Sequence, residues 1–325
     1  MVEMNGMHSY VAETRQKFPF EKIRLIVEKL KQRRVLVIGD AVIDEYVFVQ
    51  PKGTAVKDPI LSTEYRSREV YAGGILVIAN HLASFVGSMT VVTLLGDHDT
   101  QLEFVEKSLA QNARLKVFHK PNSPTIVKKR YIDGYRNNKL FKVEYINDSP
   151  LEPSLSDEIC AYLEKELPFY DLVVVGDFGH GFLNASIREL LQQKGRFTAV
   201  MCQNNSANMG YNYFTQYTKP SFLILNETEL RLPLGKRFES VEEVIHDVQE
   251  MLGYKKLIVT MGKHGCIYAD NGVLYKAPIV TTSVKDTVGA GDAVFAVGSL
   301  FAYAEAEPEL LPFIANCAGG IAANV

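Results

Sequence analysis

A turn of three small residues followed by an acid stands near the end of the chain. Gly289, Ala290 and Gly291 precede Asp292, and an apolar segment of helical composition follows. Backbone N–H groups in such a turn can approach an anion without side-chain obstruction, and the positive end of the following helix points at the same place. An acid at that rim could take a proton from a hydroxyl that attacks phosphorus, while the amides hold the spreading charge. A purely structural turn before a helix is the alternative.

Six short apolar runs recur along the chain, separated by segments long enough for helices. Each run is typical of a strand buried on both faces, and the alternation predicts a doubly wound, mainly parallel α/β sheet. In such a sheet, ligands bind at the carboxyl ends of the strands. The expected strands are 35–38, 89–97, 171–179, 197–203, 221–229 and 256–265.

Two segments break this alternation. Residues 45–70 and 114–146 are rich in β-forming residues, are interrupted by Pro, Gly and Asn, and show no helical period. They predict a small antiparallel β lid that could close over a cleft at the strand ends. No repeat or linker divides the chain, so we expect one domain over 34–325 with the lid inserted in it.

Residues 1–33 form an N-terminal extension. Its first sixteen residues are polar and are expected to be loosely ordered, whereas the rest has the spacing of an amphipathic helix. We expect this helix to pack on the domain that follows, and a membrane or partner helix is the alternative. Its apolar positions are Phe20, Ile23, Val27 and Leu30.

The composition limits the classes of partner and compartment. The chain is 47% hydrophobic and carries 35 Lys and Arg against 38 Asp and Glu, a net charge of −3. No general field therefore draws it to nucleic acid or to an anionic membrane, and a small molecule is the expected partner. The four cysteines lack metal-ligand spacing, and neither a signal peptide nor an apolar run of bilayer length is present, so a cytoplasmic protein is expected.

Four ordered motifs resemble those of the ribokinase-like, or PfkB, carbohydrate kinase family. They are "YAGG" (71–74), "NETE" (226–229), "VTMGKHG" (259–265) and "DTVGAGDA" (286–293). The resemblance extends from about Arg34 to the end of the chain, and four matches in order are far more specific than one. It implies a ribokinase-like fold and a kinase that uses ATP and Mg²⁺ to phosphorylate an alcohol hydroxyl of a sugar or sugar phosphate.

The resemblance also implies roles for individual residues. Asp292 would be the catalytic base, and the backbone amides of Gly289, Ala290 and Gly291 would form the anion hole. Glu229 would bind the Mg²⁺ ion through a water molecule. Residues expected to border the nucleotide or its phosphates are Asn226, Glu229, Thr260, Gly262, Gly265, Asp286, Thr287 and Asn316. Residues expected at the acceptor are Asp40, Gly73 and Gly74.

Several of these residues also have a structural interpretation. Asn226 could be a helix N-cap with Glu229 as its capping-box partner, and this interpretation can coexist with metal binding. Asp40 could be a turn residue and Asp44 a solvated neighbour. The glycine pair at 73–74 could serve only to relieve a tight turn between a strand and a helix.

Three segments resemble the bacterial heptose-phosphate kinase branch more than ribokinase itself: "VLVIGDAVIDEYVFV", "PTIVKKRYIDGYRNNKLFKVEY" and "VVVGDFGHGFLNASIRELL". In the second, Lys128 and Arg130 alternate along one strand and so point to one face, where they could grip a phosphate on the substrate, with Lys142 beside them. Charges that protect an edge strand are the alternative. In the third, His180 could contact the ligand or could be a hydrogen-bonded loop residue.

The expected acceptor pocket departs from the family pattern at two places. Val77 stands where the family places a sugar-binding Asn, so a hydroxyl contact is expected to be missing. The strand end "VMCQNNSANMGYN" carries amides in place of the Asp-Pro typical of the branch, and Gln203, Asn204 and Asn205 could face a different acceptor or none. The phosphoryl-transfer motifs are intact, so the sequence predicts a kinase with a diverged acceptor pocket.

Other outcomes stay open at the level of sequence. The same fold could act on a nucleoside or vitamin alcohol, or could be a catalytically idle nucleotide- or sugar-binding module. A homodimer through the lid is expected from the resemblance and from the exposed strand edges there. A chain that ends inside an expected helix suggests a truncated C-terminus, and a fused or separate nucleotidylyltransferase domain would fit the heptose branch.

Overall fold

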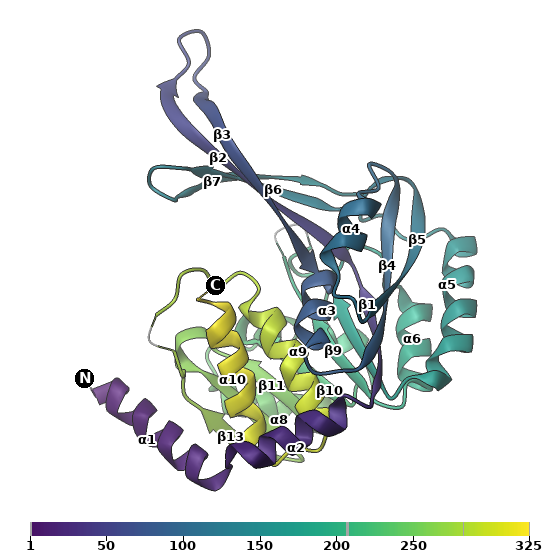
Figure 1. The fold of residues 1–325 in the computed structure, drawn as a ribbon, viewed down its shortest axis with the longest axis vertical. Helices are drawn as coiled ribbons and strands as arrows, with labels where there is room; N and C mark the ends of the chain where they lie inside the picture. Colours follow the sequence, from purple (N-terminus) through teal and green to yellow (C-terminus); the bar gives the residue numbers. More distant parts are fainter. Residues whose placement is uncertain (1, 206–207, 282, 325) are drawn as a thin grey trace.

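Nine strands form the central sheet of the computed structural model, which describes residues 2–205, 208–281 and 283–324. Helices cover this sheet, and a second sheet of four strands projects away from it (Figure 1). Alternate residues of the first strand enter different cores: Val35 and Val37 pack on one face of the sheet, and Leu36 and Ile38 pack on the other. A strand buried on both faces must be apolar at every position, which explains the continuous apolar runs of the sequence.

The strands of the central sheet lie in the order β13-β12-β11-β10-β9-β8-β1-β4-β5. Neighbours from β11 to β5 run parallel, and β12 and β13 are antiparallel. The doubly wound, mainly parallel sheet is thus confirmed, and each of the six expected strands overlaps a strand of this sheet. The bounds are β1 Arg34–Gly39, β4 Ser88–His98, β5 Ala113–Pro124, β8 Leu172–Asp177, β9 Thr198–Cys202, β10 Phe222–Asn226, β11 Lys256–Thr260, β12 Cys266–Asp270 and β13 Val273–Ala277.

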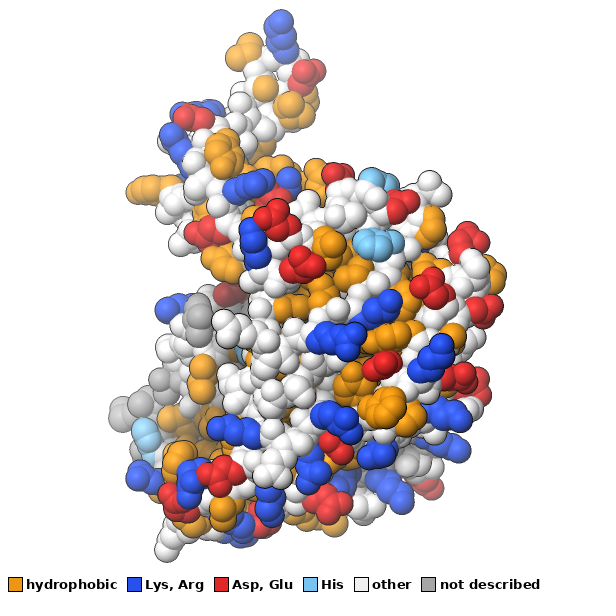
Figure 2. All heavy atoms as spheres, turned by 45° about the vertical axis from the view of Figure 1, so that its right-hand side comes forward, with side chains coloured by type: hydrophobic (Ala, Val, Ile, Leu, Met, Phe, Trp, Pro, Cys, Tyr) orange, Lys and Arg blue, Asp and Glu red, His pale blue; other side chains and the backbone are white. Residues whose placement is uncertain are grey.

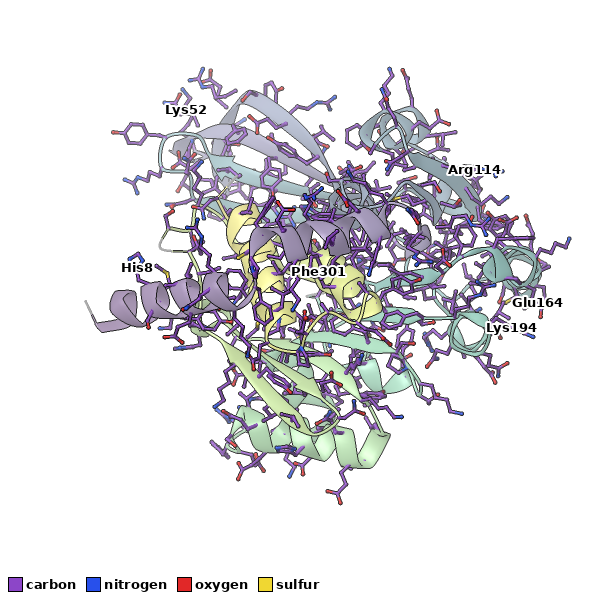
Figure 3. The ribbon with its side chains drawn as sticks, turned by 60° about the horizontal axis from the view of Figure 1, so that its bottom comes forward. His8, Lys52, Arg114, Glu164, Lys194 and Phe301 are labelled. Atoms are coloured by element: carbon purple, nitrogen blue, oxygen red, sulfur yellow. The ribbon has the colours of Figure 1, made fainter. Side chains whose placement is uncertain are left out.

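Two helical layers enclose the sheet. Residues of α2, α3, α9 and α10 belong to one core, and residues of α5, α6, α7 and α8 belong to the other. Phe301 of α9 lies deep in the first core, whereas His8, Arg114, Glu164 and Lys194 lie toward the periphery (Figure 3). The helices are α1 Val2–Lys17, α2 Phe20–Leu30, α3 Ile75–Ala83, α4 Leu102–Ser108, α5 Pro153–Glu166, α6 Ala185–Lys194, α7 Glu227–Arg231, α8 Val241–Leu252, α9 Ala290–Tyr303 and α10 Leu310–Ala322, with short 3-10 turns at Leu167–Phe169, Phe214–Gln216, Leu232–Leu234 and Gly262–His264.

The second sheet is the β lid, with strands β2 Ala41–Thr54, β3 Leu61–Gly74, β6 Val127–Asp133 and β7 Lys139–Tyr145 in the order β3-β2-β6-β7. Two of its pairs are antiparallel, but β2 and β6 run parallel, so the lid is mixed rather than antiparallel. The expected lid segment 114–146 was too long, because its first part is β5 at the edge of the central sheet. An edge strand is covered on one side only, and its alternating pattern therefore resembles that of a lid strand.

The N-terminal extension differs from expectation in two ways. The first sixteen residues were expected to be loosely ordered, but Val2–Lys17 form α1, which packs on α10 through an edge-on contact of Tyr10 with Phe313. The predicted amphipathic helix is present as α2, yet Phe20 is 73% exposed and takes no part in its buried face. Within the described part of the chain, no helix combines the length and apolarity needed to cross a membrane.

Candidate active site

The order of the strands makes β1 and β8 parallel neighbours, so their carboxyl ends lie side by side. The chain continues from β1 to β4 and β5 on one side and then to β8, β9, β10 and β11 on the other, and such a reversal point is where doubly wound sheets bind ligands. A cavity of about 270 Å³ opens there, between the base of the lid and the start of α9. Its lining is Val42, Asp44, Gly74, Lys128, Arg130, Phe178, Gln203, Thr287, Val288, Gly289, Gly291 and Asp292.

The glycines before Asp292 leave open space at the start of α9. Gly289 has φ 81° and is the N-cap residue, a conformation that an L side chain rarely adopts. A Cβ atom added at Gly289 or Gly291 would meet no atom within 4 Å. Packing therefore does not explain the glycine in the first helical turn, where glycine is a poor helix former. The N–H of Ala290 donates to the Thr287 carbonyl at 3.2 Å, whereas those of Gly291 and Asp292 have no backbone partner among the described residues. Unpaired N–H groups in the first turn of a helix are what an anion-binding turn requires.

The carboxyl group of Asp292 faces the cavity from the first turn of α9. Its Oδ1 atom is buried and has no hydrogen-bond partner among the described residues. Burial, with repulsion from Asp44, raises the pKa of Asp292 to about 7, although Lys128 opposes the rise. A base with a pKa near 7 can accept a proton and can also be ionised at neutral pH, which suits general-base catalysis.

Asp44 is a cavity residue that the sequence interpretation missed. The alternative of a solvated neighbour of Asp40 is wrong, because the Asp44 side chain is only 14% exposed and forms an ion pair with Arg130. Gly73 makes room for it, because a Cβ atom at residue 73 would lie 2.2 Å from Asp44 Oδ2. What identifies Asp44 as a cavity residue is the pairing of β2 with β6, which places Asp44 beside Lys128. The sequence of either strand alone does not show this alignment.

Lys128 and Arg130 share one face of β6 and both line the cavity, as their alternation predicted. Lys128 is 9% exposed, and burial lowers the pKa of its amine. The guanidinium of Arg130 lies 5.4 Å from the centre of the Tyr46 ring, in addition to its pairing with Asp44. For Lys128 and Arg130 the alternative of charges that protect an edge strand is wrong, because β6 lies between β2 and β7. Lys142 does lie on an edge strand, β7.

Asp40 anchors the loop beyond β8, and Gly74 at the end of β3 makes room for the Asp40 backbone. Asp40 is buried outside the cavity lining, and its Oδ2 accepts hydrogen bonds from the backbone N–H groups of Phe178 at 3.3 Å and His180 at 3.4 Å. Burial, with repulsion from Asp177, raises the pKa of Asp40 to about 7. Gly74 has φ 58°, and a Cβ atom there would lie 2.4 Å from the carbonyl oxygen of Asp40. The expected acceptor role of Asp40 stays a prediction.

The N-x-x-E motif forms a complete capping box at the start of α7. Asn226 Oδ1 accepts a hydrogen bond from the Glu229 N–H at 2.8 Å, and Glu229 Oε2 accepts one from the Asn226 N–H at 2.9 Å. Burial raises the pKa of Glu229 to about 7. The structural interpretation is confirmed, and each carboxylate oxygen retains a second lone pair that could accept a water molecule.

The T-x-G-x-x-G loop lies beside this capping box. Thr260 of β11 aligns with Asn226 of β10 at the carboxyl edge of the sheet. Gly262 has φ 55° and open space where its side chain would be. Gly265 has a packing role instead, because a Cβ atom there would lie 2.0 Å from the carbonyl oxygen of Ala277. The residues that these two motifs predict at the nucleotide are thus brought together at the carboxyl edge of the sheet.

Asn316 and Asp286 are the remaining residues predicted to border the nucleotide. Asn316 of α10 donates from its amide nitrogen to the carbonyl oxygens of Ala277 at 3.2 Å and Pro278 at 2.8 Å. Asp286 lies in the loop before α9 and pairs with Lys139 of the lid at 3.1 Å. Thr287, the next residue, lines the cavity.

The amide-rich segment after β9 is divided between the cavity and the interior. Gln203 lines the cavity. Asn204 donates its backbone N–H to Glu229 at 3.3 Å, and the Asn205 side chain donates to the Phe178 carbonyl at 2.9 Å. Residues 206–207 lie outside the described residues. Val77, the other departure from the expected pattern, is half-buried in α3 and is not part of the cavity lining.

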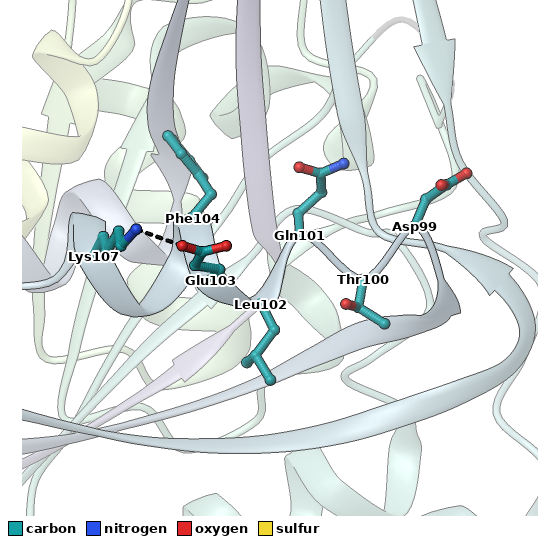
Figure 4. Close-up of a pocket in the computed structure, with 7 residues that line it drawn as sticks. All are labelled: Asp99, Thr100, Gln101, Leu102, Glu103, Phe104 and Lys107. Carbon is teal, nitrogen blue, oxygen red and sulfur yellow. Dashed lines mark hydrogen bonds and ion pairs between the residues drawn. The ribbon is translucent and has the colours of Figure 1, made fainter.

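A second hollow is open to the surface at the start of α4 and shares no residue with the cavity (Figure 4). One continuous segment forms it, and its Lys107 and Glu103 side chains pair with each other at 2.5 Å. Its lining is Asp99, Thr100, Gln101, Leu102, Glu103, Phe104 and Lys107. We therefore assign the candidate site to the cavity beneath the lid.

Comparisons with known proteins point to one family. A model of the pfkB family carbohydrate kinases matches residues 32–322. The bifunctional protein HldE of a Nitratiruptor species is 24% identical over 294 residues, which cover 89% of this chain and 61% of that protein. The D-beta-D-heptose 7-phosphate kinase of Bordetella bronchiseptica is 23% identical over 272 residues, 83% of this chain and 84% of that protein. The chain spans about three fifths of the length of its bifunctional relatives.

Solved structures confirm the ribokinase-like fold. Arabidopsis thaliana ribokinase complexed with ribose and ATP has a TM-score of 0.67 at 16% identity, covering 90% of this chain and 93% of that one. Escherichia coli phosphofructokinase-2 in complex with potassium has a TM-score of 0.69 at 16% identity, covering 90% and 92%. Because the family match extends over most of the chain and the fold agrees, this protein belongs to the pfkB family of carbohydrate kinases.

Proposed function

We propose that this protein is an ATP-dependent phosphotransferase that phosphorylates an alcohol hydroxyl of a sugar or sugar phosphate, in the manner of a heptose-phosphate kinase. One observation carries the proposal: Asp292, whose buried Oδ1 has no hydrogen-bond partner in the described part of the chain, lies at the open start of α9 and faces a cavity lined by Asp44, Lys128 and Arg130. A base, an anion-binding turn and cationic side chains around one small cavity are the parts that phosphoryl transfer to a hydroxyl requires.

Asp292 accepts the proton of the acceptor hydroxyl as the hydroxyl oxygen attacks phosphorus. Bound ATP with Mg²⁺ supplies the transferable phosphoryl group and the counter-charge for it. The backbone N–H groups of Gly289, Ala290 and Gly291 stabilise the charge that spreads over the phosphoryl oxygens. The lid, with Asp44 and Lys128, covers the acceptor and limits the access of water to the reacting groups.

The acceptor proposal rests on the polar groups of the cavity. The Asp44 carboxylate can accept hydrogen bonds from sugar hydroxyls, and the Gln203 amide can both donate and accept them. Lys128 and Arg130 can bind a phosphate that the acceptor already carries. The name of the Bordetella relative, a D-beta-D-heptose 7-phosphate kinase, supports a phosphorylated acceptor. Val77, which is half-buried, stands where the family places a sugar-binding Asn, and this supports an acceptor pocket that has diverged from that of the family.

The proposed role of Mg²⁺ fits the residues present. Among the described residues, no three His, Cys, Asp or Glu side chains come together as ligands of a protein-built metal site. Mg²⁺ commonly keeps several waters and is held by substrate phosphates with one or two carboxylates. Glu229, acting through water, supplies such a carboxylate beside the nucleotide loop, and the open space at Gly262 leaves room for the nucleotide there.

Two partners of the protein also belong to the proposal. A homodimer through the lid is supported by the apolar side chains that the lid exposes among its charges (Figure 2). The exposed apolar residues of the lid include Val56, Ile60, Leu61, Tyr65, Tyr71, Phe141, Val143 and Tyr145. A nucleotidylyltransferase domain, fused or separate, is supported by relatives that are named bifunctional.

The test is ADP release from ATP and Mg²⁺ over a panel of sugars, sugar phosphates including D-beta-D-heptose 7-phosphate, nucleosides and vitamin alcohols. Asp292→Asn should leave ATP binding nearly unchanged and reduce turnover roughly 100-fold to 10,000-fold. Asp99→Asn, in the surface hollow of Figure 4, is the matched control and should keep full activity. Equal turnover by Asp292→Asn and the parent would refute the assignment. ATP binding without turnover of any acceptor would favour an idle binding module.

A further inference from the structure

The edge of the central sheet opposite to the candidate active site carries a hollow that the proposed reaction leaves without a role. The parallel strands β1, β4 and β5 begin there, at Arg34, Ser88 and Ala113. The hollow has a volume of about 520 Å³, and ligand pockets commonly have volumes of about 300 to 1,000 Å³. We call it the amino-edge hollow, and its lining includes Arg34, Thr90, Arg114, Glu166, Phe169 and Tyr170.

Two arginines of this hollow lie on the same face of the sheet. Alternate residues of a strand share a face, and Leu36 of β1 and Phe118 of β5 belong to the core that α5 and α6 cover. Arg34 and Arg114 stand two and four positions before these residues, so both lie on that face, and Arg114 is seen at the periphery in Figure 3. The helix α5 ends at Glu166, and both arginines are exposed beyond its end.

Within the described part of the chain, neither guanidinium group has an ion pair or a hydrogen bond. Asp171 is the acid beside the start of β1, but it accepts the backbone N–H of Arg34 at 3.0 Å and lies 3.9 Å from the Arg196 guanidinium. Glu166 lines the hollow and pairs with neither arginine, and its Oε2 lies 3.5 Å from the Tyr170 hydroxyl. Two like charges without counter-ions repel each other, so an anion bound between them would stabilise both.

An aromatic ring is exposed beside these charges. Phe169 lines the hollow, is 55% exposed, and makes no ring contact with another aromatic side chain among the described residues. The turn Leu167–Phe169 contains Pro168 and is closed by the Tyr170 N–H, which donates to the Leu167 carbonyl at 3.1 Å. Tyr170 is buried, and its hydroxyl donates to Thr90 Oγ1 at 2.7 Å. A fixed turn therefore presents the Phe169 ring to solvent, where it offers a surface for stacking.

We propose that the amino-edge hollow is a second ligand site, which binds a nucleoside monophosphate. Arg34 and Arg114 bind the phosphate, because the planar N–H groups of guanidinium match its oxygens. The Phe169 ring stacks on the base, and the Glu166 carboxylate accepts a hydrogen bond from an N–H of the base. A nucleoside monophosphate carries an anion and a planar ring with N–H donors in one molecule, whereas a sugar phosphate or free phosphate lacks the ring. This inference goes beyond the proposed function, since the hollow and the cavity beneath the lid share no lining residue.

The direct test uses the absence of Trp from the sequence. Phe169→Trp places a single fluorescent reporter in the hollow of the full chain, and GMP should quench its emission to saturation with a dissociation constant of about 1 mM or lower. Phe20→Trp is the matched control, because Phe20 is 73% exposed and lies outside the lining, so its emission should show no saturable change. If GMP gives no saturable quenching in Phe169→Trp, or gives the same quenching in Phe20→Trp, the proposal is overturned.

Substitution of the arginines tests the phosphate contacts. Arg34→Gln and Arg114→Gln should each raise the dissociation constant of GMP about 10-fold or more, the effect of losing hydrogen bonds to a charged group. Lys165→Gln, which removes an exposed charge next to Glu166 but outside the lining, should bind GMP like the parent. Calorimetric titration without the reporter gives the same comparison. Unchanged binding in both arginine variants would overturn the proposal.

Competing ligands separate a nucleotide site from a simple anion site. Ribose 5-phosphate and inorganic phosphate should displace GMP only at concentrations roughly 5-fold higher or more, because both lack the stacking ring. Displacement at equal concentration would show an anion site without base recognition and would overturn the proposal. The titrations require no turnover, so GMP binding without ADP release would retain this inference and remove the kinase function. ADP release with no GMP binding in the hollow would do the reverse.

Discussion

The carboxylates of Asp44 and Asp292 line the same cavity, the first from strand β2 of the lid and the second from the first turn of α9. Repulsion from Asp44 adds to burial in raising the pKa of Asp292 and outweighs the repulsion from Glu229, and the charge of Asp44 is itself paired with Arg130. The lid therefore carries both the negative charge of Asp44 and the positive charge of Arg130 to the cavity that Asp292 faces. Lid position and the protonation of Asp292 should be coupled for this reason.

The first prediction concerns the pH dependence of activity. Asp292 must be ionised to accept a proton, so kcat/KM should rise with pH and level off above a midpoint of about 7, the pKa raised by burial. Asp44→Asn removes the repelling charge and leaves Arg130 unpaired, and both changes favour ionised Asp292. Its midpoint should therefore lie at lower pH. ADP release measured from about pH 5 to 9 checks this. An unchanged midpoint would contradict the coupling, and Asp99→Asn is the control.

A second prediction concerns Gly73, which makes room for the Asp44 carboxylate. In Gly73→Ala the added Cβ atom would lie 2.2 Å from Asp44 Oδ2 and must displace that group. The KM for the acceptor should rise roughly 10-fold or more, the effect of losing one hydrogen bond to a charged group, while the KM for ATP changes little.

The control for this substitution is Gly298→Ala. The added methyl group would touch Phe222 and Ile258 at ordinary contact distances of 3.6 to 3.7 Å in the middle of α9. Alanine favours a helix over glycine by about 1 kcal/mol, so this variant should be at least as stable as the parent and equally active. An acceptor KM that is unchanged in Gly73→Ala would show that the Asp44 carboxylate does not bind the acceptor.

A third prediction separates the two interpretations of Glu229. Glutamine can also accept the hydrogen bond of a capping box, so Glu229→Gln should cost only about 1 kcal/mol of unfolding free energy, chiefly at the Asn204 N–H. Loss of the charge should raise the Mg²⁺ concentration that gives half-maximal rate by roughly 10-fold or more.

The chain contains a matched control for Glu229, because Ser240 and Glu243 form a second capping box at the start of α8. Glu243→Gln makes the same change of side chain far from the cavity and should not alter the Mg²⁺ dependence. If Glu229→Gln has the same Mg²⁺ dependence as the parent, Glu229 is a capping residue alone.

A fourth prediction concerns the proposed dimer. Phe141, Val143 and Tyr145 are exposed on β7, on the face opposite to Lys142 and Glu144, which align with the cavity face of β6. Val143→Lys places a charge among these apolar side chains and should convert a dimer into a monomer in sedimentation experiments at micromolar concentration. A monomeric mass for the parent protein would remove the dimer proposal.

Residue type and spacing were sufficient to predict the central sheet. Strands such as β1 and β8 are buried on both faces, and this burial requires the continuous apolar residues by which they were recognised. The short-range motifs were equally visible. Asn226 and Glu229 do form a capping box, and the turn at Gly289 does begin a helix, because both depend on residues only a few positions apart.

The lid was predicted less well, since its strands are exposed on part of their surface. β5 alternates like a lid strand because it lies at an edge of the central sheet, and the parallel pairing of β2 with β6 depends on the route of the chain between them. The helix α1 has little apolar pattern of its own, and its contact with α10 over Phe313 lies some three hundred residues away in sequence. No local pattern reports such contacts.

The sequence by itself determined the fold class, the family resemblance and the identity of the proposed base. Only the tertiary structure decided that Asp44 faces the same cavity as Asp292, that Asp40 supports a loop instead of lining that cavity, and that His180 is buried without a partner among the described residues. The physical reason is that pKa, burial and pairing depend on which distant segments meet. Strand register and loop packing determine which distant segments are in contact, and neither can be predicted from residues that are neighbours in sequence.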